Sequence, residues 1–177
     1  MSTRLYPVIL GADFAQLPRA VREAHESASL MRGTVTVERG ASLISRMGGF
    51  LAGLPKACVN APCEVRFTSI QQGERWTRNM NGSVYVSTLT PAPAPGCFDE
   101  SFGLYGFRFR IDANALGARF ALVRHTVCGV ALPRLVWPRI TTSESEVGGR
   151  YRFDVEARSF TGALMVRYSG ELRPVNV

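Results

Sequence analysis

The sequence lacks the short motifs that identify nucleotide-binding, metal-binding and hydrolytic enzymes. It contains no phosphate-binding loop, dinucleotide fingerprint or nucleophile elbow, because Gly48, Gly49 and Gly53 neither precede a Lys-Ser/Thr pair nor follow a strand in the required order. Its only two histidines are His25 and His125, and its four cysteines include no C-x-x-C pair. We therefore expect no nucleotide cofactor, no metal site and no disulfide framework.

A long apolar segment is also missing. No stretch approaches the about 18 apolar residues that a membrane-spanning helix needs. The apolar run over residues 5–10 is short, contains Pro7 and is followed by no small-residue cleavage site, so it does not make a signal peptide. We expect one soluble domain over residues 1–177, without a transmembrane segment, located in the cytoplasm with its cysteines as free thiols.

Lysine is nearly absent as well. Lys56 is the only lysine among 21 basic residues, and the formal net charge is +7. Positive charge attracts nucleic acid when it is clustered beside aromatic stacking platforms or on a recognition helix. Here the arginines are scattered, and Arg108 with Arg110, like Arg150 with Arg152, stand every second residue, as on the solvated face of a strand. We expect no nucleic-acid binding.

Two segments in the first third of the chain have the periodicity of amphipathic helices. Residues 13–27 repeat apolar side chains every three to four positions, and Pro18 suits a first helical turn. Residues 42–54 carry a second apolar stripe, although Gly48 and Gly49 each weaken a helix by about 1 kcal/mol. The sequence therefore predicts two N-terminal helices.

The chain from about Cys63 to Leu172 consists of short alternating runs separated by turn signals. Asn81-Gly82 is the strongest of these signals, because both central positions of a type I′ turn need a positive φ. Such runs are typical of antiparallel hairpins rather than βαβ units. We predict an α+β, mostly antiparallel β fold: a large curved sheet or half-barrel of about nine to ten strands, covered by the two helices. Sheets of this size tend to curl or close.

Two proline-containing connections interrupt these strands. Residues 91–96 form a stiff Pro-Ala connector that is too short for a domain linker. Residues 130–138 form an apolar loop with two prolines, which is unsuited to a central strand. Such a loop must either be covered by other parts of the protein or itself cover them.

Two arginines are predicted to share a strand face with apolar residues. Alternation over residues 34–39 puts Arg39 on the face of the valines and Glu38 on the opposite face, and Arg78 shares a face with Trp76. A buried charge is costly unless it is paired. Either arginine could bind a carboxylate or phosphate of a ligand, with Trp76 stacking beside it. The alternative is an internal ion pair, for which the candidates are Glu38, Glu74, Glu100 and Asp154.

His125 shares a predicted strand face with Val123 and Val127. An imidazole titrates near neutrality, so His125 is the natural general acid or base. The alternative is a histidine satisfied inside the core. The aromatic side chains of the predicted sheet could likewise line a pocket or fill a core; they are Phe102, Tyr105, Phe107, Phe109, Phe120, Phe153 and Tyr168.

Short motifs in a consistent order extend over nearly the whole chain. They are Leu10-Gly-Ala-Asp-Phe14 with Leu17-Pro18 and His25, Val37-Glu-Arg-Gly40, Gly53-Leu-Pro55, Glu74-Arg-Trp-Thr-Arg78, Glu100-Ser-Phe-Gly103, Leu132-Pro133 with Pro138-Arg139, Phe153-Asp-Val155 and Val166-Arg-Tyr168. Together they resemble a bacterial family known as the domain of unknown function 4166. The resemblance implies no particular reaction. It does imply a possible reductase-like protein partner, since some members look fused to a nucleotide-binding reductase-like domain that these residues do not include. The connector at 91–96 departs from the family's pattern and leaves the strand pairing beside it open.

Three functional hypotheses follow. The first is a binding module that holds an apolar or amphipathic small molecule inside the curved sheet, with Arg39, Trp76, Arg78, Phe107, Phe109 and Tyr168 as ligand-binding residues. The second is a cofactor-free cyclase or isomerase acting in the same cavity, with His125 or His25 and a carboxylate such as Glu38 or Glu100 as the proton-transfer pair. The third is an interaction domain whose loop at 130–138 docks onto a reductase-like protein.

Overall fold

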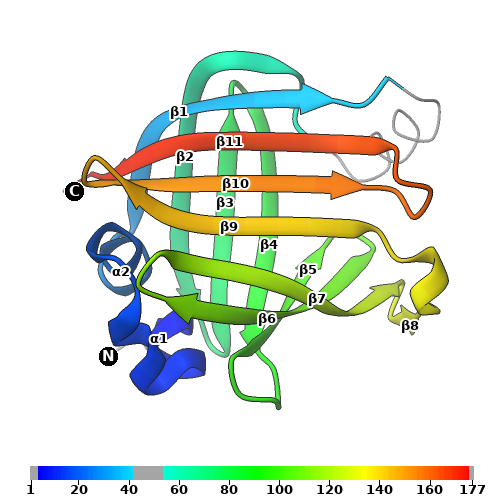
Figure 1. Cartoon of the computed structure of the whole chain (residues 1–177), viewed down its shortest axis with the longest axis horizontal. Helices are drawn as coiled ribbons and strands as arrows, with labels where there is room; N and C mark the ends of the chain where they lie inside the picture. The colour runs from blue at the N-terminus through cyan, green and yellow to red at the C-terminus, as the bar shows by residue number, and fades with distance from the viewer. Residues whose placement is uncertain (1–3, 42–53, 176–177) are drawn as a thin grey trace.

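The alternating strands close into a barrel (Figure 1). The computed structural model describes residues 4–41 and 54–175. Within these residues ten strands follow one another around the barrel, each antiparallel to its neighbours, and β1 completes the ring by pairing with β11. The predicted antiparallel sheet of nine to ten strands is confirmed, and it forms a closed barrel rather than a half-barrel.

The barrel strands pair in chain order, except that β9 follows β7 around the ring. Their bounds are β1 (Leu30–Arg39), β2 (Cys58–Ile70), β3 (Gly73–Met80), β4 (Ser83–Pro91), β5 (Cys97–Phe102), β6 (Tyr105–Asn114), β7 (Gly117–Val127), β9 (Arg139–Val147), β10 (Arg150–Arg158) and β11 (Leu164–Pro174). The short strand β8 (Val130–Ala131) pairs only with the end of β7 and lies outside the ring.

The residues that the sequence marks as turns do connect neighbouring strands in the structure. Asn81 and Gly82 have φ values of 49° and 82° and join β3 to β4 as a tight hairpin. Both residues tolerate the left-handed region, which other side chains rarely adopt. The connector at 92–96 joins β4 to β5, and these strands pair between Thr88–Pro91 and Phe98–Ser101. The connector is therefore also a hairpin loop, which settles the pairing that the sequence left open.

The N-terminal helical segment has three parts: α1 (Leu5–Leu10), a 3₁₀ helix η1 (Gly11–Gln16) and α2 (Arg19–Glu26). The single helix predicted over residues 13–27 is thus divided, because the residue before a proline avoids the helical region. Leu17 is extended, with φ −66° and ψ 148°, and α2 begins only after Pro18. The sequence analysis did not predict α1. The helix predicted over residues 42–54 lies, apart from Leu54, outside the described residues.

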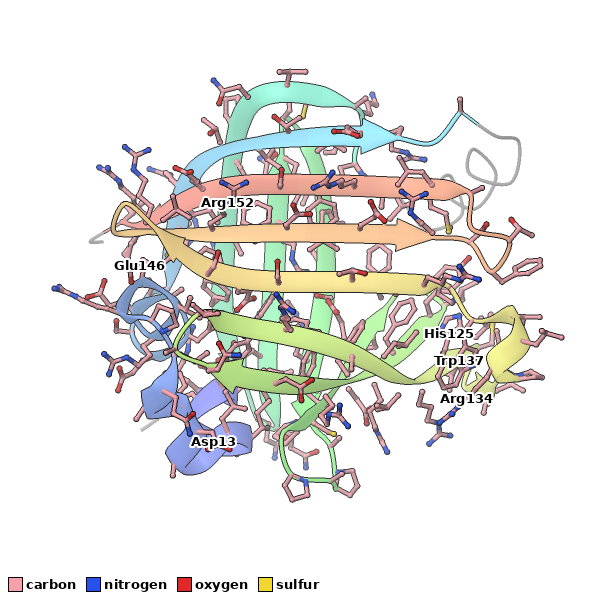
Figure 2. The ribbon with its side chains drawn as sticks, viewed as in Figure 1. Asp13, His125, Arg134, Trp137, Glu146 and Arg152 are labelled. Atoms are coloured by element: carbon pink, nitrogen blue, oxygen red, sulfur yellow. The ribbon has the colours of Figure 1, made fainter. Side chains whose placement is uncertain are left out.

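These helices cover one end of the barrel, as Figure 1 shows at the left. Two of them are tied to the strands by a carboxylate: in α1 the Leu5 N–H donates to buried Glu74 Oε1 at 2.9 Å, and in α2 the Ala20 N–H donates to Glu146 Oε2 at 2.7 Å. In Figure 2, Asp13 and Glu146 lie at this end, whereas Arg134 and Trp137 lie at the opposite end. Among the described helices, none has the length and apolar character needed to cross a membrane.

Candidate functional site

The barrel encloses a cavity of about 480 Å³. Its volume lies within the range of small-molecule pockets, about 300–1,000 Å³. All seven aromatic residues proposed to form a pocket or a core line this cavity, namely Phe102, Tyr105, Phe107, Phe109, Phe120, Phe153 and Tyr168. The inward strand faces are therefore partly packed core and partly cavity wall.

One wall of the cavity is a row of nearly parallel rings on β6 and β7. The His125 ring lies over Phe107, with ring centroids 4.7 Å apart and planes 8° from parallel. Tyr105 continues the row, its centroid 6.4 Å from that of Phe107. Offset stacking of this kind leaves flat apolar faces and edges available to a planar or aliphatic ligand.

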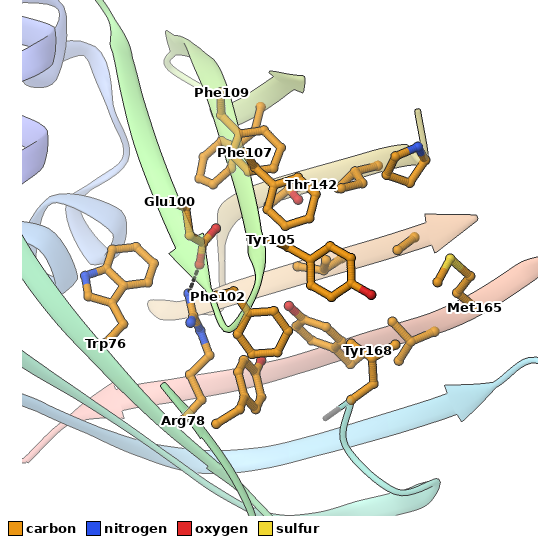
Figure 3. A pocket seen from close by; sticks show the side chains of 18 of the residues that line it. Trp76, Arg78, Glu100, Phe102, Tyr105, Phe107, Phe109, Thr142, Met165 and Tyr168 are labelled. Atoms are coloured by element: carbon orange, nitrogen blue, oxygen red, sulfur yellow. Dashed lines mark hydrogen bonds and ion pairs between the residues drawn. The ribbon is translucent and has the colours of Figure 1, made fainter. Parts of the chain in front are cut away.

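Arg78 and Glu100 form the ion pair of this cavity, as the dashed line in Figure 3 shows. Arg78 Nη2 lies 3.4 Å from Glu100 Oε1, and Nη1 donates to Ser87 Oγ at 2.6 Å. The guanidinium also stacks 4.9 Å from the ring centroid of Trp76 and 5.3 Å from that of Tyr85. The structure thus joins two predicted site residues, Arg78 and Glu100, which come from the non-neighbouring strands β3 and β5.

The surroundings of Arg78 keep it charged. Burial acts to lower the pKa of Arg78, but Tyr85 and Glu100 raise it, and the pKa ends above its ordinary value. The same burial raises the pKa of Tyr85 well above the ordinary range, so Tyr85 is a neutral hydroxyl. The pair therefore offers a ligand both a permanent donor, Arg78, and an acceptor, Glu100.

His125 lines the cavity without a carboxylate partner among the described residues. Its Nδ1 lies 3.1 Å from the Gly106 carbonyl oxygen, and burial lowers the pKa of the imidazole. Of the carboxylates predicted to act with it, Glu100 is bound to Arg78, and Glu38 is exposed on the outer face of β1. The structure does not bring His125 together with Glu38, because inward and outward residues alternate along a strand.

Arg39 lies outside the cavity lining and has a different set of contacts. Its Nη1 donates to the carbonyl oxygens of Leu54 and Pro55, both at 3.1 Å. Burial lowers the pKa of Arg39. Since Leu54 and Pro55 themselves line the cavity, Arg39 positions part of the wall rather than facing a ligand. Trp76, Phe107, Phe109 and Tyr168, by contrast, do line it.

A second polar cluster lies where the helices meet the cavity, and the sequence analysis missed it. Glu144 on β9 lines the cavity and accepts hydrogen bonds from Tyr6 Oη, 3.1 Å from each carboxylate oxygen. His25 Nε2 lies 2.9 Å from Glu144 Oε2, and the Tyr6 and His25 rings stack at 3.6 Å. Burial and the nearby Glu144 carboxylate raise the pKa of Tyr151. The alternation of β9 could have placed Glu144 inward, but nothing local in the sequence indicates its partners on α1 and α2.

The helical end holds one further buried carboxylate. Glu74 Oε1 lies 3.0 Å from Arg4 Nε, and Glu74 Oε2 accepts from the Trp76 indole N–H at 2.7 Å. The buried carboxylates Glu74 and Glu144 thus have hydrogen-bonded partners, as burial requires, whereas Arg22 Nε and His25 Nδ1 on α2 are buried without a partner among the described residues. Among the described residues, no group of three or more His, Cys, Asp or Glu side chains could hold a metal ion.

The cavity reaches the surface at the end opposite the helices. Its lining there includes Leu132, Val136 and Pro138 from the β7–β9 connection, and Phe160 and Met165 near the β10–β11 turn. The apolar loop at 130–138 therefore covers part of the cavity. It also leaves some of its own side chains in solvent, since Leu135 is 86% exposed.

Comparison with known proteins gives one match that covers most of the chain. A family model described as Domain of unknown function (DUF4166) matches residues 17–172, which include α2 and all of the barrel except the last residues of β11. The search of curated proteins found no significant match.

Proposed function

The chain belongs to the DUF4166 family, and we propose that its barrel is a binding module for an uncharged small molecule that is apolar or amphipathic. The observation that carries the proposal is the cavity of about 480 Å³, whose wall is mostly aromatic and aliphatic; its charged groups are the Arg78–Glu100 ion pair and Glu144, which is hydrogen-bonded to Tyr6 and His25. Apolar walls with a few placed polar groups are the usual composition of ligand sites. A closed barrel of this strand number has room for a ligand in its interior.

The Arg78–Glu100 pair argues that the ligand carries no net charge. A ligand carboxylate at Arg78 would lie close to Glu100 in a site where water screens poorly, and a ligand cation at Glu100 would lie close to Arg78. A neutral group with an acceptor and a donor, such as an amide, an alcohol or a phenol, can satisfy both residues. The rest of the ligand would then lie along the ring row of Tyr105, Phe107 and His125.

A neutral fluorescent probe tests the proposal directly. We expect N-phenyl-1-naphthylamine to increase its fluorescence on binding the wild-type protein. Ala157→Trp places a large ring in the cavity, because Ala157 lines it, and should weaken probe binding at least tenfold. Ala115→Trp is the matched control, because Ala115 is exposed in the turn between β6 and β7. Thermal melting of both variants verifies that they are folded.

Two outcomes would overturn the binding proposal. The first is a wild-type protein that does not bind the probe. The second is equal binding by Ala157→Trp and Ala115→Trp, which would place the probe on the outer surface. Native mass spectrometry of the purified protein adds an independent measurement, since a copurified apolar molecule would appear as a defined mass increase.

One observation favours an enzyme as a second candidate. Glu144 faces the cavity and lies within hydrogen-bond distance of His25, so a histidine–carboxylate pair does exist at the cavity floor. It differs from the predicted pairs with Glu38 or Glu100. Incubating the protein with its copurified molecule in D₂O distinguishes the two functions. Proton transfer would exchange ligand hydrogens for deuterium and Glu144→Gln would abolish that exchange, whereas simple binding leaves the ligand mass unchanged.

A reductase-like protein partner remains a prediction. The loop at 130–138 contributes Leu132, Val136 and Pro138 to the cavity, which accounts for part of its apolar character without a partner. Its remaining exposed residues lie at the open end of the barrel.

A further inference from the structure

The open end of the barrel carries a group of exposed apolar side chains, which we call the apolar rim. They come from three connections at the end opposite the helices: the β5–β6 turn, the β7–β9 connection and the β10–β11 turn. The β5–β6 turn and the β7–β9 connection are joined by a hydrogen bond from Cys128 N–H to the Leu104 carbonyl at 2.8 Å. The rim consists of Leu104, Val130, Leu135, Val136 and Phe160, which are 65%, 65%, 86%, 40% and 50% exposed.

The apolar rim is continuous with the cavity. Val136 and Phe160 belong both to the rim and to the cavity lining. Tyr105, which follows Leu104, lines the cavity as well. A contiguous apolar surface that runs from the outside into a pocket marks an interaction site rather than scattered surface residues.

The charge around the rim has one sign. The described connections at this end are residues 40–41, 54–57, 80–83, 102–105, 128–139 and 159–163. Together they contain Lys56, Arg134 and Arg139 but no aspartate or glutamate. All three cations are exposed. The Arg134 guanidinium lies 5.6 Å from the ring centroid of Trp137, a combination common where proteins meet the lipid headgroup region (Figure 2).

We propose that this end of the barrel docks on a lipid bilayer that contains anionic headgroups, so that the ligand passes between the bilayer and the cavity without crossing water. This inference rests on the proposed function, because an apolar ligand is the reason to connect the cavity with a lipid phase. Exposed apolar residues insert shallowly into the interface between the bilayer and water, and each nearby Lys or Arg increases the affinity for anionic lipid about fivefold. The occupant is a membrane rather than a protein because the rim combines apolar residues with cations alone, which complements an anionic lipid surface.

Vesicle co-sedimentation tests the docking. We expect the wild-type protein to sediment with vesicles of phosphatidylcholine and phosphatidylglycerol at about 7:3, and much less with phosphatidylcholine alone. Leu135→Ser and Arg134→Glu should each reduce the bound fraction at least threefold. The matched controls change the same residue types away from the rim. Leu116→Ser alters a leucine that is 82% exposed at the helical end, and Arg75→Glu alters an exposed arginine on β3.

The controls separate docking at the rim from attraction of the whole +7 molecule to negative lipid. Equal losses for Arg134→Glu and Arg75→Glu, or an unchanged bound fraction for Leu135→Ser, would refute docking at the rim. A dimer in solution that Leu135→Ser converts to a monomer would instead identify the rim as an interface between two copies, and would also overturn the inference.

N-phenyl-1-naphthylamine binding without vesicles, measured on the same variants, keeps the two proposals apart. Normal probe binding with no sedimentation leaves the binding function standing and refutes the docking. Loss of probe binding by the wild-type protein refutes the proposed function itself.

Discussion

Replacing Glu100 by Gln should change which ligands the cavity accepts. In the wild type, a carboxylate bound at Arg78 would lie about 4 Å from the Glu100 carboxylate, and two like charges at that distance repel by about 4 kcal/mol at an effective dielectric constant of about 20. The side chains of Arg78 and Glu100 are only 13% and 20% exposed, so solvent screens the repulsion partially. If screening doubles the dielectric constant to about 40, about 2 kcal/mol remains.

Glu100→Gln removes this repulsion and keeps an acceptor for Arg78 Nη2. At about 1.4 kcal/mol per tenfold in affinity, relief of 2–4 kcal/mol corresponds to about 30- to 1,000-fold. The assay is competition of dodecanoate and dodecanol against N-phenyl-1-naphthylamine at pH 8, where free carboxylates are ionised. We expect the ratio of the dodecanoate Kd to the dodecanol Kd to fall by that factor in the variant, with the dodecanol Kd nearly unchanged.

Glu156→Gln is the control with the same change in net charge. Glu156 pairs with Arg158 and is absent from the cavity lining, so the ratio should remain at its wild-type value. A wild-type protein that already prefers dodecanoate, or an equal ratio in Glu100→Gln and the wild type, would refute the argument that the ion pair selects an uncharged ligand.

Three further predictions concern the stability and reactivity of the barrel around the cavity. Glu144→Gln should lower the free energy of unfolding by about 3 kcal/mol in urea denaturation, because the carboxylate accepts buried bonds from Tyr6 and His25; a loss below about 1 kcal/mol would show that the cluster is not structural. Cys128 should react with Ellman's reagent at pH 8 in the native protein while Cys63 does not, because Cys128 is exposed and burial raises the pKa of Cys63 from 9.0 to about 12. The free energy of unfolding should accordingly decrease as the pH rises from about 9 to about 12. Rapid modification of Cys63 in the native protein would contradict the raised pKa. Gly33→Ala should destabilise the barrel by more than about 2 kcal/mol, since a Cβ there would overlap the Glu171 carbonyl oxygen on β11, whereas a melting temperature equal to that of the wild type would show that β1 and β11 can separate locally.

The sequence predicted the local geometry of the barrel better than its closure. Asn81-Gly82 specified its hairpin because a type I′ turn depends only on two backbone conformations. The alternation of Phe107 and Phe109 with outward arginines correctly grouped the side chains that line one wall. The pairing of β1 with β11 joins residues such as Met31 and Pro174, and no short-range pattern reports a contact over that separation.

The candidate site was predictable to a similar extent. Parity identified Arg78 as an inward candidate, and Glu100 was one of several candidate carboxylates, but the choice of partner depends on how β3 and β5 curve around the barrel. The cluster of Tyr6, His25 and Glu144 was not predictable, since it joins α1, α2 and β9, and the sequence analysis did not predict α1. Arg39 illustrates the opposite case: it is the last residue of β1, and its guanidinium binds the Leu54 and Pro55 carbonyls instead of lining the cavity.

The carboxylate anchors of the N-terminal helices have a consequence for ligand orientation. Glu74, Glu144 and Glu146 bind these helices to the barrel at three separate points, so exchange through that end would require breaking several hydrogen bonds at once, two of them buried. In Figure 3 the Arg78–Glu100 pair lies deeper than Tyr105 and Met165, which lie toward the open end. Entry from the open end would make binding sequential: the polar end of the ligand goes in first and comes out last. The apolar end then stays nearest the entrance throughout, which is the end that a lipid surface can accept directly.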